Sequence, residues 1–124
     1  MKKIKILLAS VKGENFLQPM EIEDDLKTFY KLIDCDTIDI VTRSFGGKFF
    51  DIICDDEGWF KENPCFSASN RAGTDGIVGN IIITGVSDRE GNLPSLTDED
   101  VKRISSKTSF AIFRDKSIPV LIFD

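Results

Sequence analysis

Histidine is absent from this sequence of 124 residues. Its absence excludes the Ser-His-Asp and Cys-His nucleophile systems, and it removes the side chain best suited to proton transfer near neutral pH. Carboxylate and lysine chemistry remain open. The composition therefore favours a non-catalytic binding protein over an enzyme.

Cysteine is scarce as well: Cys35, Cys54 and Cys65 are the only three, and no two of them form a C-x-x-C pair. An odd number argues against a disulfide framework, and a zinc site usually needs four Cys or His ligands in close pairs. We expect buried, reduced thiols that pack as small hydrophobic groups, with no bound metal and no cofactor. Reduced thiols also suit a protein that stays in the cytoplasm of the host cell.

Long apolar runs and an excess of positive charge are both missing. No segment approaches the roughly 18 continuous apolar residues of a membrane span. The apolar stretch that starts at Ile4 is interrupted by Lys5 and has no small-residue cleavage site after it, so we expect a first strand there and not a signal peptide. The net charge of −5 disfavours non-specific binding to DNA or RNA, which needs a basic surface. We expect neither a membrane nor a nucleic acid as partner.

Hydrophobic residues make up 41% of the chain, enough for the core of a single domain over residues 1–124. Period-two alternation and short apolar runs predict strands, and two segments with helical spacing follow Asp or Thr caps. The predicted strands cover residues 3–11, 20–22, 37–43, 48–54, 77–86, 109–113 and 118–123, and the helices begin at Asp24 or Asp25 and at Thr97. Residues 61–76 are expected to be irregular. The expected fold is α+β, a mostly antiparallel sheet of five to seven strands with two helices packed against it.

Several sequence blocks follow one another in a distinctive order. They are residues 38–43 (IDIVTR), 46–48 (GGK), 51–58 (DIICDDEG), 78–83 (VGNIII) and 95–100 (SLTDED). In this order the chain resembles, over roughly residues 4–105, the family named domain of unknown function 3846. The family name implies no activity. Its members are small proteins of bacteriophages and other mobile elements, mostly in Firmicutes such as clostridia, so the resemblance implies an accessory protein for counter-defence or for modulating host proteins.

Two cations flank a predicted glycine turn. Arg43 and Lys48 lie on either side of Gly46-Gly47, which joins two predicted strands as a hairpin. Such a turn holds cations beside exposed backbone amides, and that combination binds phosphate or carboxylate. The alternative is an ordinary solvated turn, because the sequence contains no G-x-x-x-x-G-K-[ST] phosphate loop.

A second candidate site lies in and before the segment expected to be irregular. Asn70 and Arg71 form a plausible ligand clamp, because Arg supplies a bidentate fork and Asn can read a base edge or a ribose. Trp59 and Phe66 can stack on a base or anchor a partner. The alternatives are exposed loop residues without a partner and, for the aromatic rings, core packing.

Acidic residues gather around the second predicted strand of the hairpin: Asp51, Asp55, Asp56 and Glu57. They suggest a divalent-ion site or paired carboxylates for acid–base chemistry. However, the calcium-loop pattern is not met, and adjacent acids on one turn repel each other and face water. We therefore expect a solvated acidic turn, with neither metal ligands nor catalytic residues.

Two classes of function follow. In the first, a homodimer or larger homo-oligomer binds and sequesters a small anionic ligand, such as a nucleotide immune signal. The polar contacts would come from Arg43, Lys48, Asn70 and Arg71, and the stacking surface from Trp59 or Phe66. In the second, the protein inhibits or modulates a host protein through an acidic and aromatic surface. The clustering of basic residues near Gly-rich turns in an acidic chain favours the first class.

Overall fold

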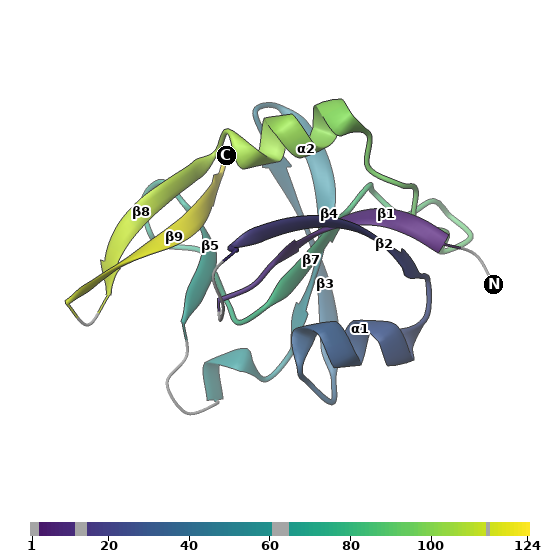
Figure 1. Cartoon of the computed structure of the whole chain (residues 1–124), viewed down its shortest axis with the longest axis horizontal. Helices are drawn as coiled ribbons and strands as arrows, with labels where there is room; N and C mark the ends of the chain where they lie inside the picture. The colour runs from purple at the N-terminus through teal and green to yellow at the C-terminus, as the bar shows by residue number, and fades with distance from the viewer. Residues whose placement is uncertain (1–2, 12–14, 61–64, 114) are drawn as a thin grey trace.

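The computed structural model of the chain describes residues 3–11, 15–60, 65–113 and 115–124 (Figure 1). The described strands form two sheets, one of five strands in the order β2-β1-β7-β4-β3 and one of four in the order β6-β5-β9-β8. The strands are β1 (Lys3–Ala9), β2 (Leu17–Glu23), β3 (Ile38–Phe45), β4 (Lys48–Asp55), β5 (Phe66–Asn70), β6 (Gly76–Val78), β7 (Ile81–Thr84), β8 (Thr108–Phe113) and β9 (Lys116–Phe123). The helices are α1 (Leu26–Ile33) and α2 (Asp98–Ser105), with a 3-10 turn, η1 (Gly58–Phe60). The predicted α+β fold is confirmed.

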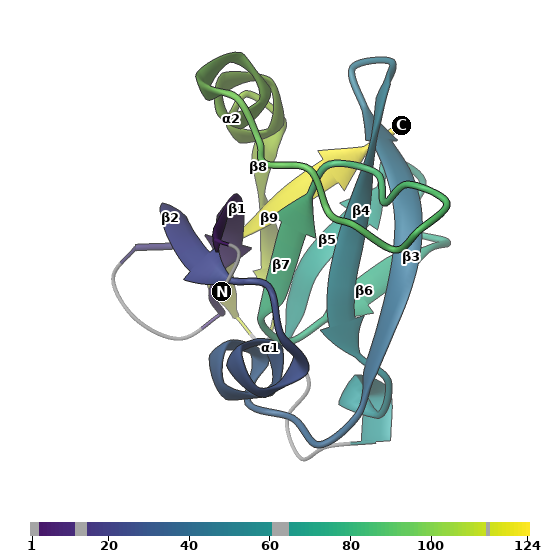
Figure 2. The ribbon, with the colours of Figure 1, turned by 90° about the vertical axis from the view of Figure 1, so that its right-hand side faces the viewer.

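The larger sheet is buried on both faces, each covered by a different element. One face packs against Phe29 and Ile33 of α1. The other face packs against Leu121 and Phe123 of β9 and against Ile104 of α2. Figures 1 and 2 show α1 and α2 at opposite ends of the molecule, with the smaller sheet beside the larger one. This layering explains why the strands at the centre of the larger sheet are apolar on both sides.

The predicted first strand illustrates this double burial. In β1, Ile4 and Ile6 belong to the core beneath α1, whereas Leu7 and Ala9 belong to the core beneath the smaller sheet. Accordingly β1 lies inside the larger sheet, between β2 and β7. Neither helix, in the part of the chain that the structure describes, is long and apolar enough to cross a membrane.

The predicted hairpin forms between β3 and β4, with antiparallel register from Ile38 opposite Asp55 to Phe45 opposite Lys48. Its turn consists of Gly46 and Gly47, with φ of 61° and 88°. A two-residue turn that follows the twist of the strands requires positive φ at both positions, which only glycine adopts without cost. The glycine pair therefore fixes the register of these two strands.

Two segments differ from their predicted form. Residues 77–86, expected as one strand, divide at Gly79 and Asn80 into β6 of the smaller sheet and β7 of the larger one. Residues 61–76, expected to be irregular, contain β5, which pairs in parallel with β9 and antiparallel with β6. Residues 61–64 lie outside the described residues. The difference arises because β5 is short, polar in sequence and paired with the last strand of the chain.

Candidate functional site

A groove runs along the outer face of the smaller sheet. Leu121 and Phe123 of β9 point into the core, so Ile122 between them faces the opposite side. The groove has two adjoining hollows that share Arg71, Ser109 and Ile122. One hollow, of about 670 Å³, is slightly more polar than apolar, and the other, of about 340 Å³, is largely apolar. A ligand with one charged end and one apolar end would match this arrangement.

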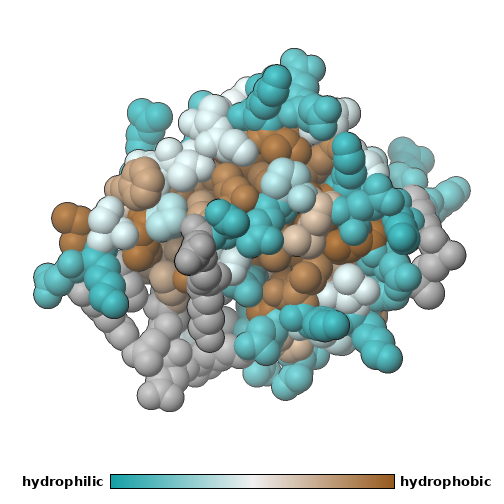
Figure 3. All heavy atoms as spheres, viewed as in Figure 1, coloured by the Kyte–Doolittle hydropathy of each residue, from teal (hydrophilic) through white to brown (hydrophobic). Residues whose placement is uncertain are grey.

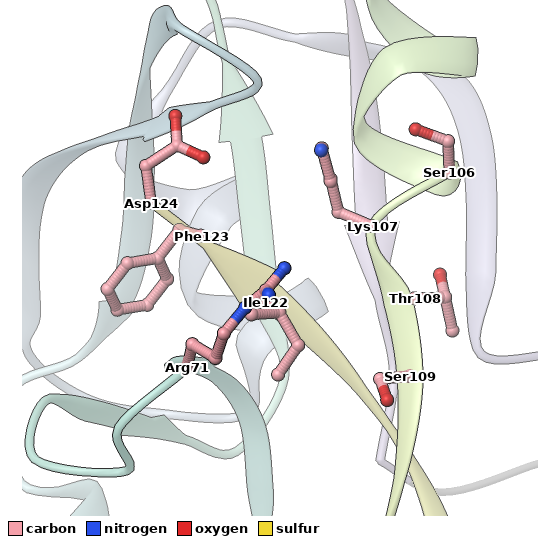
Figure 4. Close-up of a pocket in the computed structure, with 8 residues that line it drawn as sticks. All are labelled: Arg71, Ser106, Lys107, Thr108, Ser109, Ile122, Phe123 and Asp124. Carbon is pink, nitrogen blue, oxygen red and sulfur yellow. The ribbon is translucent and has the colours of Figure 1, made fainter.

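The polar hollow lies between the β5–β6 turn and the start of β8. Arg71 enters it from the turn, and Lys107 faces it from the junction of α2 and β8, with β9 forming the floor (Figure 4). Further polar groups come from the hydroxyl-bearing residues Ser106, Thr108 and Ser109. Two cations on opposite walls, with hydroxyl-bearing residues along the wall of Lys107, form a setting suited to an anionic group.

Arg71 is a cation of the groove that is available to a ligand. It is exposed, and within the described residues it forms no ion pair. Its guanidinium lies over the groove beside Ile122 (Figure 4). Since a guanidinium presents donors in a planar fork, this position allows bidentate contact with a phosphate or carboxylate.

The carboxylate of Asp124 closes one end of the polar hollow but is already engaged. Its oxygens accept hydrogen bonds from the amides of Gly47 at 2.8 Å and Gly46 at 3.3 Å, and from the Ser44 hydroxyl at 2.9 Å. The Gly47 amide, followed by the Ser44 hydroxyl, holds the pKa of Asp124 below its usual value. The glycine turn thus binds a carboxylate, as its exposed amides predict, but that carboxylate belongs to the same chain.

The apolar hollow continues the groove along β8 and β9. Its floor and walls include Phe66, Ala111, Ile118, Val120 and Ile122. Trp59 packs edge-on against Phe66, with the ring centroids 5.2 Å apart, and stays 53% exposed. Trp59 faces a separate, smaller hollow, so it supports Phe66 without lining the groove. The predicted pair of aromatic residues is therefore adjacent, and Phe66 is the member that faces the groove.

The predicted cations Arg43 and Lys48 are held by acidic partners elsewhere in the fold. Arg43 forms an ion pair with Asp75 at 2.9 Å and lies over the ring of Phe123, 5.6 Å from its centroid. Lys48 forms an ion pair with the buried Asp100 at 2.6 Å. Both cations therefore tie elements together, and neither lines the groove.

Asn70 and Arg71 are adjacent in sequence but have different roles in the structure. The side-chain oxygen of Asn70 accepts hydrogen bonds from the amides of Thr74 at 2.9 Å and Asp75 at 3.2 Å, and its amide group donates to the Thr74 hydroxyl at 2.8 Å. These bonds organise the turn between β5 and β6. Asn70 thereby presents Arg71 to the groove and contributes to its rim.

Asp51 is buried, whereas the sequence predicted that it lies in a solvated acidic turn. It is 2% exposed, and its oxygens accept from the Thr42 hydroxyl at 2.7 Å and the Ser87 amide at 2.9 Å. It therefore anchors the loop after β7, whereas Asp56 and Glu57 are exposed as expected. No group of three or more acidic or Cys side chains suited to a metal ion occurs in the described ranges.

Lys107 is a cation of the groove that was not predicted from the sequence. It follows α2 within the run Ser105-Ser106-Lys107-Thr108-Ser109, four hydroxyl residues around one cation. A cation among hydroxyl residues just after a helix is the sequence feature that could have predicted an anion-binding position there. The predicted site residues brought together at the groove are Phe66, Asn70 and Arg71.

Comparison with known proteins identifies a family and nothing closer. Neither the search of curated proteins nor the search of solved structures found a match. One family model, described as Domain of unknown function (DUF3846), matches residues 4–109, which include β1 to β7, α2 and the start of β8. The chain therefore belongs to the DUF3846 family.

Proposed function

We propose that this protein binds a small anionic ligand in the groove over β5, β9 and β8 and holds it without converting it chemically. The supporting observation is Arg71, an exposed guanidinium with no ion pair among the described residues, facing Lys107 across a polar hollow. The two other cations that the sequence nominated, Arg43 and Lys48, both have acidic partners within the fold. Arg71 does not, so it has charge to offer a ligand.

A nucleotide is the ligand class that best combines the two hollows. Its phosphates carry the charge that Arg71 and Lys107 attract, and its base is a flat, largely apolar group that suits the surface around Phe66 and Ile122. In the setting implied by the family resemblance, sequestering a nucleotide immune signal in the host cytoplasm would counter host defence. The proposal of sequestration rests on the chain having no His and on the described lining of the groove having no Cys and no pair of carboxylates.

The proposal is tested by titrating the protein calorimetrically with cyclic nucleotides and ADP-ribose-type nucleotides. We expect at least one to bind and to be recovered intact by chromatography after heat denaturation of the complex. Failure of every nucleotide to bind would refute the ligand class. A cleaved product would refute sequestration and would turn attention to lysine and carboxylate chemistry around the groove.

A second candidate function is inhibition of a host protein through the surface around Trp59. This ring is 53% exposed and borders a hollow of about 200 Å³ that also includes Asp55 and Asp56. An exposed indole beside carboxylates suits a basic segment of a partner protein. Native mass spectrometry of the protein purified from its host distinguishes the two functions, since a bound small molecule supports the first and a bound protein the second.

A further inference from the structure

Strand β8 is an unprotected sheet edge. It is the last strand of the order β6-β5-β9-β8, so one side of its backbone has no strand partner among the described residues. Its sequence, TSFAIF, contains no charged residue and no proline, and Phe110 and Ile112 are 71% and 82% exposed. In Figure 3, apolar residues reach the surface over the β8–β9 hairpin at the left of the molecule.

The other three described edges carry the features that normally prevent pairing. The edge strand β2 contains Pro19 and two glutamates, Glu21 and Glu23. The edge strand β3 contains Asp39 and Arg43, and β6 is only 3 residues long. Strand β8 has none of these protections. An exposed apolar edge of this kind is a template for another strand.

The hydrogen bonds to β9 determine which groups of β8 point outwards. The Ile122 amide donates to the Lys107 carbonyl at 2.8 Å, and the register pairs Ser109 with Val120 and Ala111 with Ile118. Because backbone groups alternate sides along a strand, the amides and carbonyls of Thr108, Phe110 and Ile112 face the free edge. They have the spacing that an antiparallel partner strand requires.

We propose that β8 pairs antiparallel with β8 of a second copy of this chain, about a two-fold axis at Ala111. This register pairs the outward backbone groups of Phe110 with those of Ile112 of the other copy, and brings their apolar side chains together. Shifting the pairing by two residues places Ile112 opposite Thr108 in one direction and carries the partner of Phe110 beyond the end of β8 in the other. The strand is thus self-complementary in its backbone groups and in its apolar side chains.

In this dimer the two smaller sheets join into one sheet, with Ala111 of each copy on the outer face. The two grooves lie side by side on that face, because β8 forms one wall of each groove. Arg71 comes from the opposite wall, in the β5–β6 turn (Figure 4). The dimer therefore does not depend on the proposed ligand, and either proposal can fail without the other.

Light scattering coupled to size-exclusion chromatography tests the assembly. At micromolar concentrations we expect the wild-type chain to have twice the mass of one copy. Ile112→Lys should raise the dissociation constant at least about tenfold, since a charged lysine protects an edge strand from pairing. Ile40→Lys is the matched control, because Ile40 is 48% exposed on β3, outside the proposed contact, and should leave the dimer unchanged. A wild-type monomer, or equal effects of both substitutions, would overturn the proposal.

Cysteine cross-linking tests the register. Under mild oxidation Ala111→Cys should form a disulfide between copies, since directly opposed residues in a non-hydrogen-bonded pair have Cα atoms roughly 4.5 Å apart. Ser109→Cys is the control, because in this register the two copies of residue 109 lie roughly 13 Å apart. Cross-linking of Ser109→Cys but not Ala111→Cys would rule out this pairing, and the wild-type chain gives the background from the three native cysteines.

Discussion

Arg43 and Arg71 show how far the surroundings decide what one side chain can do. Arg43 donates to Asp75 at 2.9 Å and to the Thr42 carbonyl at 2.8 Å, so its fork is already occupied. Arg71 has no such acidic partner in the described structure and faces a hollow. Both residues look alike in the sequence, because each is a lone Arg near glycine. Asp75 lies 32 residues from Arg43 in the chain, and only the fold brings them together.

Cys54 should be the least reactive of the three thiols. Burial, followed by the negative charges of Asp39 and Asp55, raises the pKa of its thiol to about 11. Since the thiolate is the reactive form, we expect a disulfide reagent at pH 8 to modify Cys35 and Cys65 in the folded protein and Cys54 only after unfolding. Mass spectrometry of peptides from the labelled protein measures this order. Prompt labelling of Cys54 in the folded state would contradict the buried position of β4.

Asp124 should make the stability of the protein sensitive to acid. Its pKa is lowered in the folded state by the Gly47 amide and the Ser44 hydroxyl. The ionised carboxylate therefore stabilises the fold above the unfolded pKa of about 3.9, and this contribution is lost as the pH falls through the lower, folded pKa. Asp124→Asn should reduce the free energy of unfolding at neutral pH.

Urea unfolding at neutral pH and at about pH 3 measures the effect of Asp124→Asn. We expect the difference between the variant and the wild type to shrink at the lower pH, where the wild-type carboxylate also loses its charge. Glu57→Gln removes an exposed carboxylate and serves as the control. An equal deficit at both pH values would mean that the charge of Asp124 does not contribute.

At the scale of elements, α2 depends on the contacts of its first turn. The Thr97 hydroxyl accepts from the Asp100 amide at 3.0 Å, and the Asp100 carboxylate accepts from the Thr97 amide at 3.0 Å. The sequence predicted Thr97 as the cap, which is confirmed, and the reciprocal bond to Asp100 completes a capping box. Burial of Asp100 opposes its ionisation, but the hydrogen bonds from Lys48 and Thr97 outweigh that effect and hold its pKa below the usual value.

Removing the Thr97 hydroxyl should therefore cost measurable stability. Thr97→Ala leaves the Asp100 amide without its capping acceptor, and we expect the free energy of unfolding to fall by about 1 kcal/mol. Thr97→Ser keeps the hydroxyl and should retain most of the stability. Denaturant unfolding of both variants makes the comparison. Equal losses for Ala and Ser would show that the hydroxyl does not cap α2.

Elements defined by local patterns could be predicted from the sequence, and elements defined by distant pairing could not. The β3–β4 hairpin, the caps of α1 and α2 and the double burial of β1 follow from signals within a few residues. Strand β5 has no such signal, because its parallel partner β9 is the last strand of the chain. The division of residues 77–86 into two strands at Gly79 could not be predicted either, since apolar residues continue on both sides of it.

The same distinction applies to the candidate site. Arg71 and Phe66 could be nominated from residue type, and both line the groove. The sequence could not show that Lys48 and Arg43 lie outside the groove, because their acidic partners lie 52 and 32 residues away along the chain. Lys107 joins the groove only because β8 pairs with β9 and places the end of α2 opposite the β5–β6 turn.

For the whole molecule, the division into two sheets creates the groove. One face of the smaller sheet is used to cover the core, so its other face is left open to solvent along β5, β9 and β8. The open face carries a charged end and an apolar end, on a chain whose net charge is −5. A local cationic site on an acidic protein favours a small anion over a long polyanion such as DNA, which would meet repulsion elsewhere on the surface.

The most direct test of the anion-binding groove is calorimetric titration with the tightest-binding nucleotide of the panel. Charge-assisted hydrogen bonds contribute about 1.5–3 kcal/mol each, so Arg71→Ala should weaken binding roughly tenfold to a hundredfold. Arg89→Ala removes the same charge from an exposed position outside the groove and should change the affinity less than about twofold. Wild-type affinity in Arg71→Ala, or an equal loss in Arg89→Ala, would contradict binding in this groove.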